Sequence, residues 1–163
     1  MMPAELVRHL DELFSRFDAA AEDAGIEKIK TIGDAYMAAG GLPLPSATHA
    51  SDVVKAALEI RDFINEGKAL KIAKGLPFFE IRVGVHTGPV VAGIVGIKKY
   101  AYDIWGDTVN IASRMESHGM PNRLHISDDV RQALTSSFEL EERGHIDIKN
   151  RGQILTWFVN GTV

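Results

Sequence analysis

The N-terminal half of the chain carries two stripes of apolar side chains at helical spacing. In the first stripe the apolar residues lie three or four positions apart, with charged residues between them: Leu6, Leu10, Leu13, Phe14 and Phe17. The second stripe has a similar spacing: Ala50, Val53, Val54, Ala57, Leu58 and Ile60. Such spacing places each set on one side of an α-helix. We therefore predict amphipathic helices from Glu5 to near Asp23, where Gly25 follows as a breaker, and from Ser46 to Phe63.

Strand patterns follow each of these helices. Residues 26–32 and 35–39 are predicted to form two short strands joined by the Gly-Asp dipeptide at 33–34, which is common in hairpin turns. Residues 81–85 alternate between apolar and other side chains, as a strand with one polar face does. Arg82 is expected on that polar face.

The remaining elements complete a mixed fold. They are a loop at 40–45, a glycine-punctuated extended segment up to 100–105, a helix at 107–117, a strand at 124–126, a short helix at 127–134, and closing strands at 138–148 and 154–159. Asp107 is a favourable helix cap, and Gly119 and Pro121 end that helix. Helices and strands that alternate around hairpins indicate an α+β or α/β sandwich. We expect a single domain over residues 1–163.

Composition narrows the possible partners and compartments. The 163 residues include 18 basic and 22 acidic side chains, a net charge of -4 with no long basic tract, so nucleic acid is not expected as a partner. The absence of cysteine excludes disulfides and thiolate chemistry and is compatible with the cytoplasm. The longest apolar run, 89–97, is too short to cross a bilayer, so a membrane anchor would lie outside this chain.

The Gly-Asp turn offers one candidate metal ligand. Asp34 follows a strand that carries Lys28 and Lys30, and a carboxylate is a suitable hard ligand for Mg²⁺, which completes its shell with water and phosphate oxygens. The alternative is purely structural, because Gly-Asp is also an ordinary turn sequence.

Further polar residues allow both a functional and a structural interpretation. Asn110 and Arg114 are spaced i, i+4 on one helix face, where they could bind a ligand through an amide and a guanidinium or simply face solvent. Asp103 lies among aromatic and apolar residues, where it either caps a turn or accepts a hydrogen bond from a ligand. Lys149 and Arg151 could belong to an ordinary charged hairpin turn.

Several other active-site motifs do not occur. The chain has no Gly-x-Ser-x-Gly nucleophile elbow and no Gly-x-x-x-x-Gly-Lys-Ser/Thr phosphate loop. Its 6 histidines show no metal-ligand spacing, and His86 is expected to be a hydrogen-bonded strand histidine rather than a ligand.

Three long segments together resemble the catalytic domain of class III adenylyl and guanylyl cyclases: 27–37 (EKIKTIGDAYM), 82–90 (RVGVHTGPV) and 102–115 (YDIWGDTVNIASRM). The resemblance runs from the first helix to the last strand. It implies an α+β fold, the ferredoxin-like α/β sandwich of that family.

The resemblance also implies a role for each polar residue singled out above. Asp34 matches the second metal-binding aspartate. Lys30 and Asp103 match the pair that recognises adenine, because a lysine donates to adenine N1 and an aspartate accepts from its exocyclic amine. The catalytic and phosphate-binding positions of the family are matched by Asn110, which orients the ribose, by Arg114, which steadies the transition state, and by Lys149 and Arg82, which reach the phosphates.

The implied activity is that of an adenylate cyclase in cyclic-nucleotide signal transduction. ATP would be converted to 3′,5′-cyclic AMP and pyrophosphate with two Mg²⁺ or Mn²⁺ ions. The site would lie at the interface of a homodimer, so that a monomer is inactive. A sensor or membrane domain is expected upstream in the full-length protein.

The chain departs from the family at its start. Family members begin with an apolar strand that carries the first metal aspartate and with a glycine-containing loop, and neither precedes the helix at Glu5. We expect the loss to weaken one metal site and to expose strand edges that favour a rearranged dimer. Two hypotheses follow: an adenylate cyclase truncated at its front, or a catalytically inactive cyclase-like module that binds nucleotide or dimerises. We favour the enzyme, because the matched site residues are retained together.

Overall fold

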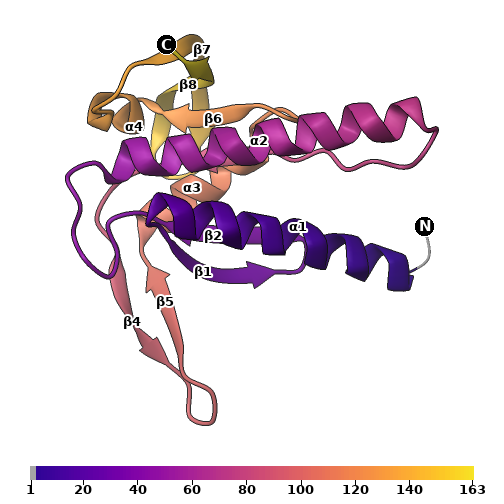
Figure 1. The fold of residues 1–163 in the computed structure, drawn as a ribbon. Helices are drawn as coiled ribbons and strands as arrows, with labels where there is room; N and C mark the ends of the chain where they lie inside the picture. Colours follow the sequence, from indigo (N-terminus) through magenta and orange to yellow (C-terminus); the bar gives the residue numbers. More distant parts are fainter. Residues whose placement is uncertain (1–2) are drawn as a thin grey trace.

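The computed structural model describes residues 3–163 as a mixed α+β fold (Figure 1). Its elements are α1 (Pro3–Ala24), β1 (Glu27–Ile32), β2 (Ala35–Ala39), α2 (His49–Ala73), β3 (Val83–Val85), β4 (Val91–Val95), β5 (Ala101–Trp105), α3 (Asp107–Ser117), β6 (Leu124–Ser127), α4 (Asp128–Ala133), β7 (Phe138–Ile148) and β8 (Gly152–Thr162). The strands form a central sheet in the order β3-β6-β8-β7 and two separate hairpins, β1-β2 and β4-β5.

The central sheet is covered by helices on both faces. It is mixed, since β6 runs parallel to β3 and antiparallel to β8. On one face α2 and α4 pack on the sheet in the main core: Val54, Ala57, Leu58, Leu124, Ile126, Val130, Phe138 and Val159. On the other face α3 packs on β7 and β8: Ile111, Met115, Ile146 and Ile148, with Ile154 beside them. Burial of both faces explains why every residue of β6 is buried.

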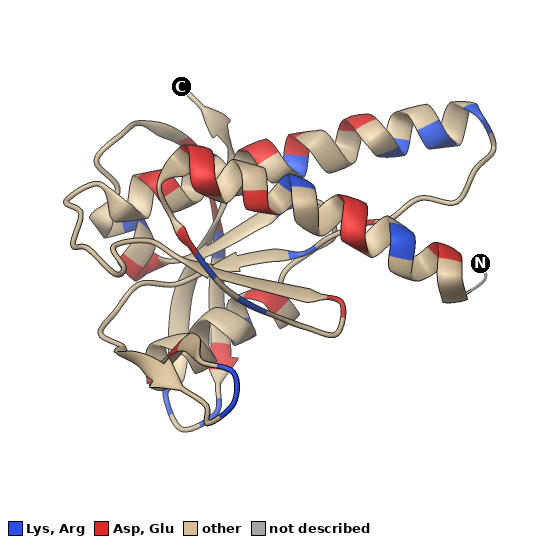
Figure 2. Cartoon of the chain, turned by 60° about the horizontal axis from the view of Figure 1, so that its bottom comes forward, with Lys and Arg blue, Asp and Glu red and all other residues tan. Residues whose placement is uncertain are grey.

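The two hairpins lie away from the central sheet. The β1–β2 hairpin packs against α1, which runs beside α2, and the β4–β5 hairpin projects from the molecule (Figure 1). Acidic and basic residues are both spread along α1 and α2, and the tip of the projecting hairpin carries lysines (Figure 2). Within residues 3–163, no helix is long and apolar enough to span a bilayer.

The predicted α+β sandwich is confirmed, with differences at the ends of elements. The second helix runs to Ala73 rather than Phe63. In its last turns Leu70 and Ile72 are 63% and 54% exposed. These turns therefore do not continue the apolar stripe from which the helix was predicted. The segment expected only to be extended contains strand β4. Asp107 is the first residue of α3, and Gly106 takes the cap position.

A glycine allows α3 to lie directly on strand β3. A Cβ atom placed on Gly84 would stand 2.1 Å from the backbone nitrogen of Glu116 and 2.5 Å from the carbonyl carbon of Met115. Non-bonded heavy atoms do not approach this closely, so no side chain fits between the strand and the helix. Gly84 thus sets the separation between α3 and the central sheet.

We predict that Gly84→Ala destabilises the fold by about 1–3 kcal/mol, because the opposing atoms belong to the helix backbone and cannot rotate away. Urea unfolding followed by circular dichroism measures the change. The matched control is Gly67→Ala in α2, where an added Cβ meets nothing within 4 Å. Alanine favours a helix, so this control is expected to gain about 0.5–1 kcal/mol. Equal stability of the two variants would contradict the close-packing argument.

Candidate active site

Lys30 and Asp103, 73 residues apart in the sequence, meet in the structure. The Lys30 Nζ atom lies 2.9 Å from Asp103 Oδ2 and joins β1 to β5. Asp103 also accepts a hydrogen bond of 2.8 Å from the backbone N–H of Ile104. The hydrogen bond from Lys30, with that from Ile104, lowers the pKa of Asp103 below its usual value. The carboxylate is therefore ionised at neutral pH and acts only as an acceptor.

The strand that carries Lys30 is fixed on α1 through a second acidic residue. Asp18 of α1 accepts a hydrogen bond of 2.7 Å from the Tyr36 hydroxyl and one of 3.2 Å from Lys28. Burial and the Asp18 carboxylate raise the pKa of Tyr36, which stays protonated as the donor. The register of the hairpin shifts between Lys28 and Lys30, which is a β-bulge. The two lysines consequently bind different carboxylates.

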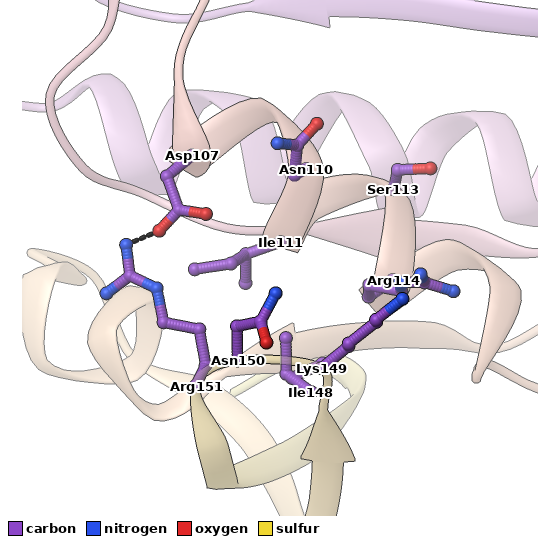
Figure 3. A pocket seen from close by; sticks show the side chains of 9 residues that line it. All are labelled: Asp107, Asn110, Ile111, Ser113, Arg114, Ile148, Lys149, Asn150 and Arg151. Carbon is purple, nitrogen blue, oxygen red and sulfur yellow. Dashed lines mark ion pairs between the residues drawn. The ribbon is translucent and has the colours of Figure 1, made fainter.

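A second group of predicted residues lines one pocket of about 510 Å³ between α3 and the turn that joins β7 to β8 (Figure 3). Helix α3 contributes Asn110 and Arg114, and the turn contributes Lys149. Asp107, Ile111, Ser113, Ile148, Asn150 and Arg151 complete the lining. The i, i+4 spacing of Asn110 and Arg114 places both on the helix face that meets the pocket.

The pocket has an excess of positive charge. Asp107, the one carboxylate among the described residues that line it, forms an ion pair with Arg151. Within residues 3–163, neither Arg114 nor Lys149 forms an ion pair. Two cations without a counter-charge on opposite walls are suited to bind a polyanion such as a triphosphate.

A buried histidine anchors the helix that carries Asn110 and Arg114. His125 of β6 is fully buried, and its Nδ1 atom lies 2.8 Å from the backbone carbonyl oxygen of Met115 in α3. That geometry requires a proton on Nδ1, which leaves Nε2 as an acceptor, and Arg143 approaches Nε2 at 3.4 Å. Burial is the main cause that lowers the pKa of His125.

The other two predicted residues lie outside the pocket. Asp34 stands exposed at the turn between β1 and β2, where Gly33 adopts the left-handed φ of 58°. Arg82 precedes β3 and pairs at 3.7 Å with Glu116 of α3. The roles given to Lys30, Asp103, Asp34, Arg82 and the pocket residues stay predictions.

The fit of a divalent metal rests on Asp34 alone. No cluster of three or more histidine or acidic side chains able to hold a metal occurs among residues 3–163. Magnesium often uses only one or two protein carboxylates and takes its other ligands from water and phosphate. The exposed carboxylate of Asp34 fits such a site as one ligand.

Sequence reasoning missed the pairing of the two charged residues at the edge of the pocket. Asp107 is predicted to be a helix cap and Arg151 part of a charged turn, whereas in the structure their side chains form an ion pair at the edge of the pocket. No role is predicted for His125. The sequence shows only that these residues lie in predicted elements. A contact between residues far apart in the sequence leaves no local pattern that could reveal it.

Comparison with known proteins identifies the family. A family profile described as the adenylate and guanylate cyclase catalytic domain matches residues 1–161. An adenylate cyclase of Mycobacterium tuberculosis is 45% identical over 159 residues, which cover 98% of this chain and 35% of that protein. The chain therefore spans about a third of the length of this curated relative.

Solved structures agree with this result. The guanylate cyclase domain of RhGC from Catenaria anguillulae, solved in complex with GTP, is 34% identical with a TM-score of 0.89 over 100% of this chain and 87% of that chain. A non-canonical dimeric guanylyl cyclase domain from Blastocladiella emersonii is 29% identical with a TM-score of 0.83 over 99% and 86%. The chain belongs to the class III adenylyl and guanylyl cyclase catalytic domain family.

We predict that stability falls as the pH drops from 6.5 toward 5 and that His125→Gln reduces this slope. The unfolded chain takes up a proton near the ordinary histidine pKa of 6.5, whereas the folded pKa of His125 is lowered, so acid favours the unfolded chain. His86, also lowered mainly by burial, contributes the same sign. Urea midpoints at several pH values test the prediction, with exposed His145→Gln as the control. An unchanged slope in His125→Gln would contradict it.

Proposed function

We propose that the chain is an adenylate cyclase domain that converts ATP to 3′,5′-cyclic AMP and pyrophosphate in cyclic-nucleotide signalling. The observation that carries the proposal is the convergence of Asn110, Arg114 and Lys149 on one cationic pocket. Family membership supports a nucleotide cyclase. The choice of ATP over GTP rests on Lys30 and Asp103.

The paired state of Lys30 and Asp103 suits adenine. Adenine presents an acceptor at N1 and a donor at its exocyclic amine, which match a lysine and an ionised aspartate. Guanine presents the reverse, a donor at N1 and an acceptor at O6. The lowered pKa of Asp103 keeps its carboxylate an acceptor, which opposes guanine O6. Because the two side chains are already in contact at 2.9 Å, little ordering is needed when the base arrives.

The pocket residues suit the phosphoryl chemistry. The ribose 3′ oxygen loses its proton and attacks the α-phosphorus, and the bond from that phosphorus to the bridging oxygen breaks to release pyrophosphate. Negative charge grows on the phosphoryl oxygens during this step. Arg114 and Lys149 are positioned to offset that charge, and Asn110 to hold the ribose. Arg82 is proposed to reach the phosphates after leaving Glu116, a half-exposed partner.

A divalent ion, Mg²⁺ or Mn²⁺, is proposed to be held by Asp34. When bound, such an ion polarises phosphate oxygens and lowers the pKa of the attacking hydroxyl. The exposed position of Asp34 at a hairpin turn leaves its carboxylate open to a bound nucleotide and to water. The two-ion mechanism of the resemblance requires a further carboxylate in addition to Asp34.

We further propose that the active form is a homodimer that uses the β4–β5 hairpin. The hairpin projects from the fold and exposes large apolar side chains: Val91 at 68%, Ile94 at 70%, Ile97 at 92% and Tyr100 at 76%. An apolar surface of this kind typically marks a protein interface. The dimeric Blastocladiella domain supports a second copy of this chain as the occupant. A sensor or membrane domain in the rest of the full-length protein is part of the same proposal.

We predict that Ile94→Asp shifts the chain from dimer to monomer and abolishes turnover, because a charge would be buried in the interface. Analytical ultracentrifugation measures the state. The matched control is Leu70→Asp on α2, where the side chain is similarly exposed at 63%. This control is expected to remain a dimer. A monomeric wild-type chain with full activity would contradict the dimer proposal.

We predict that the chain with Mg²⁺ or Mn²⁺ forms cyclic AMP from ATP in preference to cyclic GMP from GTP. The double variant Lys30→Glu, Asp103→Asn should lower the ATP-to-GTP ratio of kcat/KM by about 10- to 100-fold, since the donor to adenine N1 is lost. Lys28→Ala is the control on the same strand, because Lys28 binds Asp18 and not Asp103.

Three outcomes of this assay separate the hypotheses. An unchanged ratio in the double variant would refute the base-recognition roles. A wild-type preference for GTP would make the chain a guanylate cyclase. Binding of ATP by calorimetry without either product would support the inactive nucleotide-binding module instead.

A further inference from the structure

The turn between β7 and β8 carries one wall of the pocket, and a local backbone hydrogen bond closes it. The Arg151 N–H donates to the Ile148 carbonyl at 2.9 Å, and Asn150 and Gly152 adopt positive φ values of 67° and 77°. These features define the shape of the turn. Ile148 at the end of β7 packs on α3. In the described part of the chain, however, the backbone of residues 149–151 forms no hydrogen bond to the helix, and the position of this tip determines where Lys149 stands.

Among the described residues, one ion pair joins the tip of this turn to α3. Arg151 reaches from the turn to Asp107, the first residue of the helix (Figure 3). The helix dipole also favours a carboxylate at the helix N-terminus. Both the dipole of α3 and the Arg151 guanidinium therefore stabilise the Asp107 carboxylate. The two side chains are half-exposed, at 50% and 46%, and exposed pairs of this kind contribute little to global stability. The effect of this pair should therefore be local.

The same pair separates two hollows. Asp107 and Arg151 line the pocket with Lys149 and also a neighbouring hollow of about 790 Å³ that His86 and His145 help to line. The pair is thus part of the wall on the side away from Arg114. Among the described residues that line the pocket, Asp107 is the one carboxylate, and Arg151 neutralises it.

We infer that Asp107 and Arg151 are positioning residues. They hold Lys149 in the pocket opposite Arg114 and Asn110, where it can bind the phosphates. The inference rests on the proposed function of this pocket. The ion pair fastens the turn to the helix, and it removes a negative charge that would repel the phosphates of a nucleotide. Neither residue needs to touch the reacting atoms.

Positioning and charge removal make different predictions for the two single variants. If Arg151 only neutralised Asp107, then Asp107→Ala would bind ATP at least as well as the wild type. If the pair positions Lys149, both Asp107→Ala and Arg151→Ala lower kcat by about 10- to 100-fold, with a smaller change in KM. The kcat of the double alanine variant should be no lower than that of the poorer single variant, because either single substitution already removes the whole contact. Arg151→Lys keeps the charge and should recover much of the rate.

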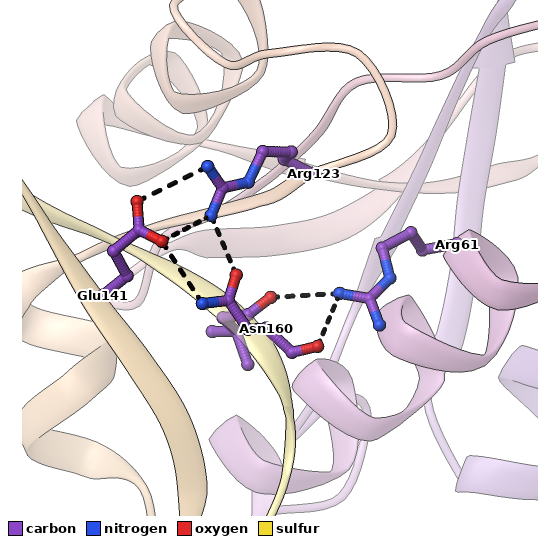
Figure 4. A network of polar contacts seen from close by, with 5 residues as sticks. Arg61, Arg123, Glu141 and Asn160 are labelled. Carbon is purple, nitrogen blue, oxygen red and sulfur yellow. Dashed lines mark hydrogen bonds and ion pairs between the residues drawn. The ribbon is translucent and has the colours of Figure 1, made fainter. Parts of the chain in front are cut away.

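The matched control is a second arginine–carboxylate pair on the same sheet. Arg123 binds Glu141 of β7 at 3.1 Å and Asn160 of β8 at 2.8 Å, within a network that includes Arg61 (Figure 4). None of these residues lines the pocket. Arg123→Ala and Glu141→Ala are expected to leave kcat and KM unchanged.

Hydrogen exchange tests the positioning role without any need for activity. In the wild-type chain, amides of the turn at 149–152 are expected to exchange more slowly than in Arg151→Ala or Asp107→Ala, while Arg123→Ala matches the wild type. Equal exchange in all variants would overturn the inference, even in an active enzyme. An inactive wild type with the expected exchange pattern would instead count against the proposed function. It would still support the positioning role of the Asp107–Arg151 ion pair.

Discussion

The close packing of α3 on β3 is the constraint on which the rest of the site depends. Gly84 lets the helix backbone meet the strand, and His125 fixes the helix through the Met115 carbonyl. Two of the three matched pocket residues, Asn110 and Arg114, lie on this helix. A displacement of α3 would therefore move them together, relative to a Lys149 that belongs to a different element.

Charge pairing within the chain shapes both parts of the site. Asp103 is paired with Lys30 and Asp107 with Arg151, so each of these two carboxylates already has a cation. Arg114 and Lys149 retain charges without such a partner in the described part of the chain. The difference matters for the proposed function. Cations without a partner attract a polyanion, whereas the paired Lys30 and Asp103 are proposed to recognise a neutral base by hydrogen bonds.

Much of the fold follows from local patterns, whereas the contacts that assemble the site do not. Apolar stripes predicted α1 and α2, although the helices start at Pro3 and His49 rather than at Glu5 and Ser46. The predicted Gly-Asp turn of the first hairpin is present, and Gly33 there has a positive φ. The bulge before Lys30 has no such signal, although alternation alone would keep Lys28 and Lys30 together. His125 appears in the sequence as one residue of a short strand. Its role arises only when a helix ten residues earlier lies against it.

The β1–β2 hairpin links two proposed functions in one small element. Lys30 lies on its first strand and Asp34 at its turn, so base recognition and metal binding share one support. That support is held at two places, by Asp18 through Tyr36 and Lys28, and by Asp103 through Lys30. A hairpin in isolation is only marginally stable, so these contacts determine its position. A base that engages Lys30 and Asp103 would consequently act on the element that carries Asp34, and this gives the proposed substrate a direct influence on where the metal ligand stands.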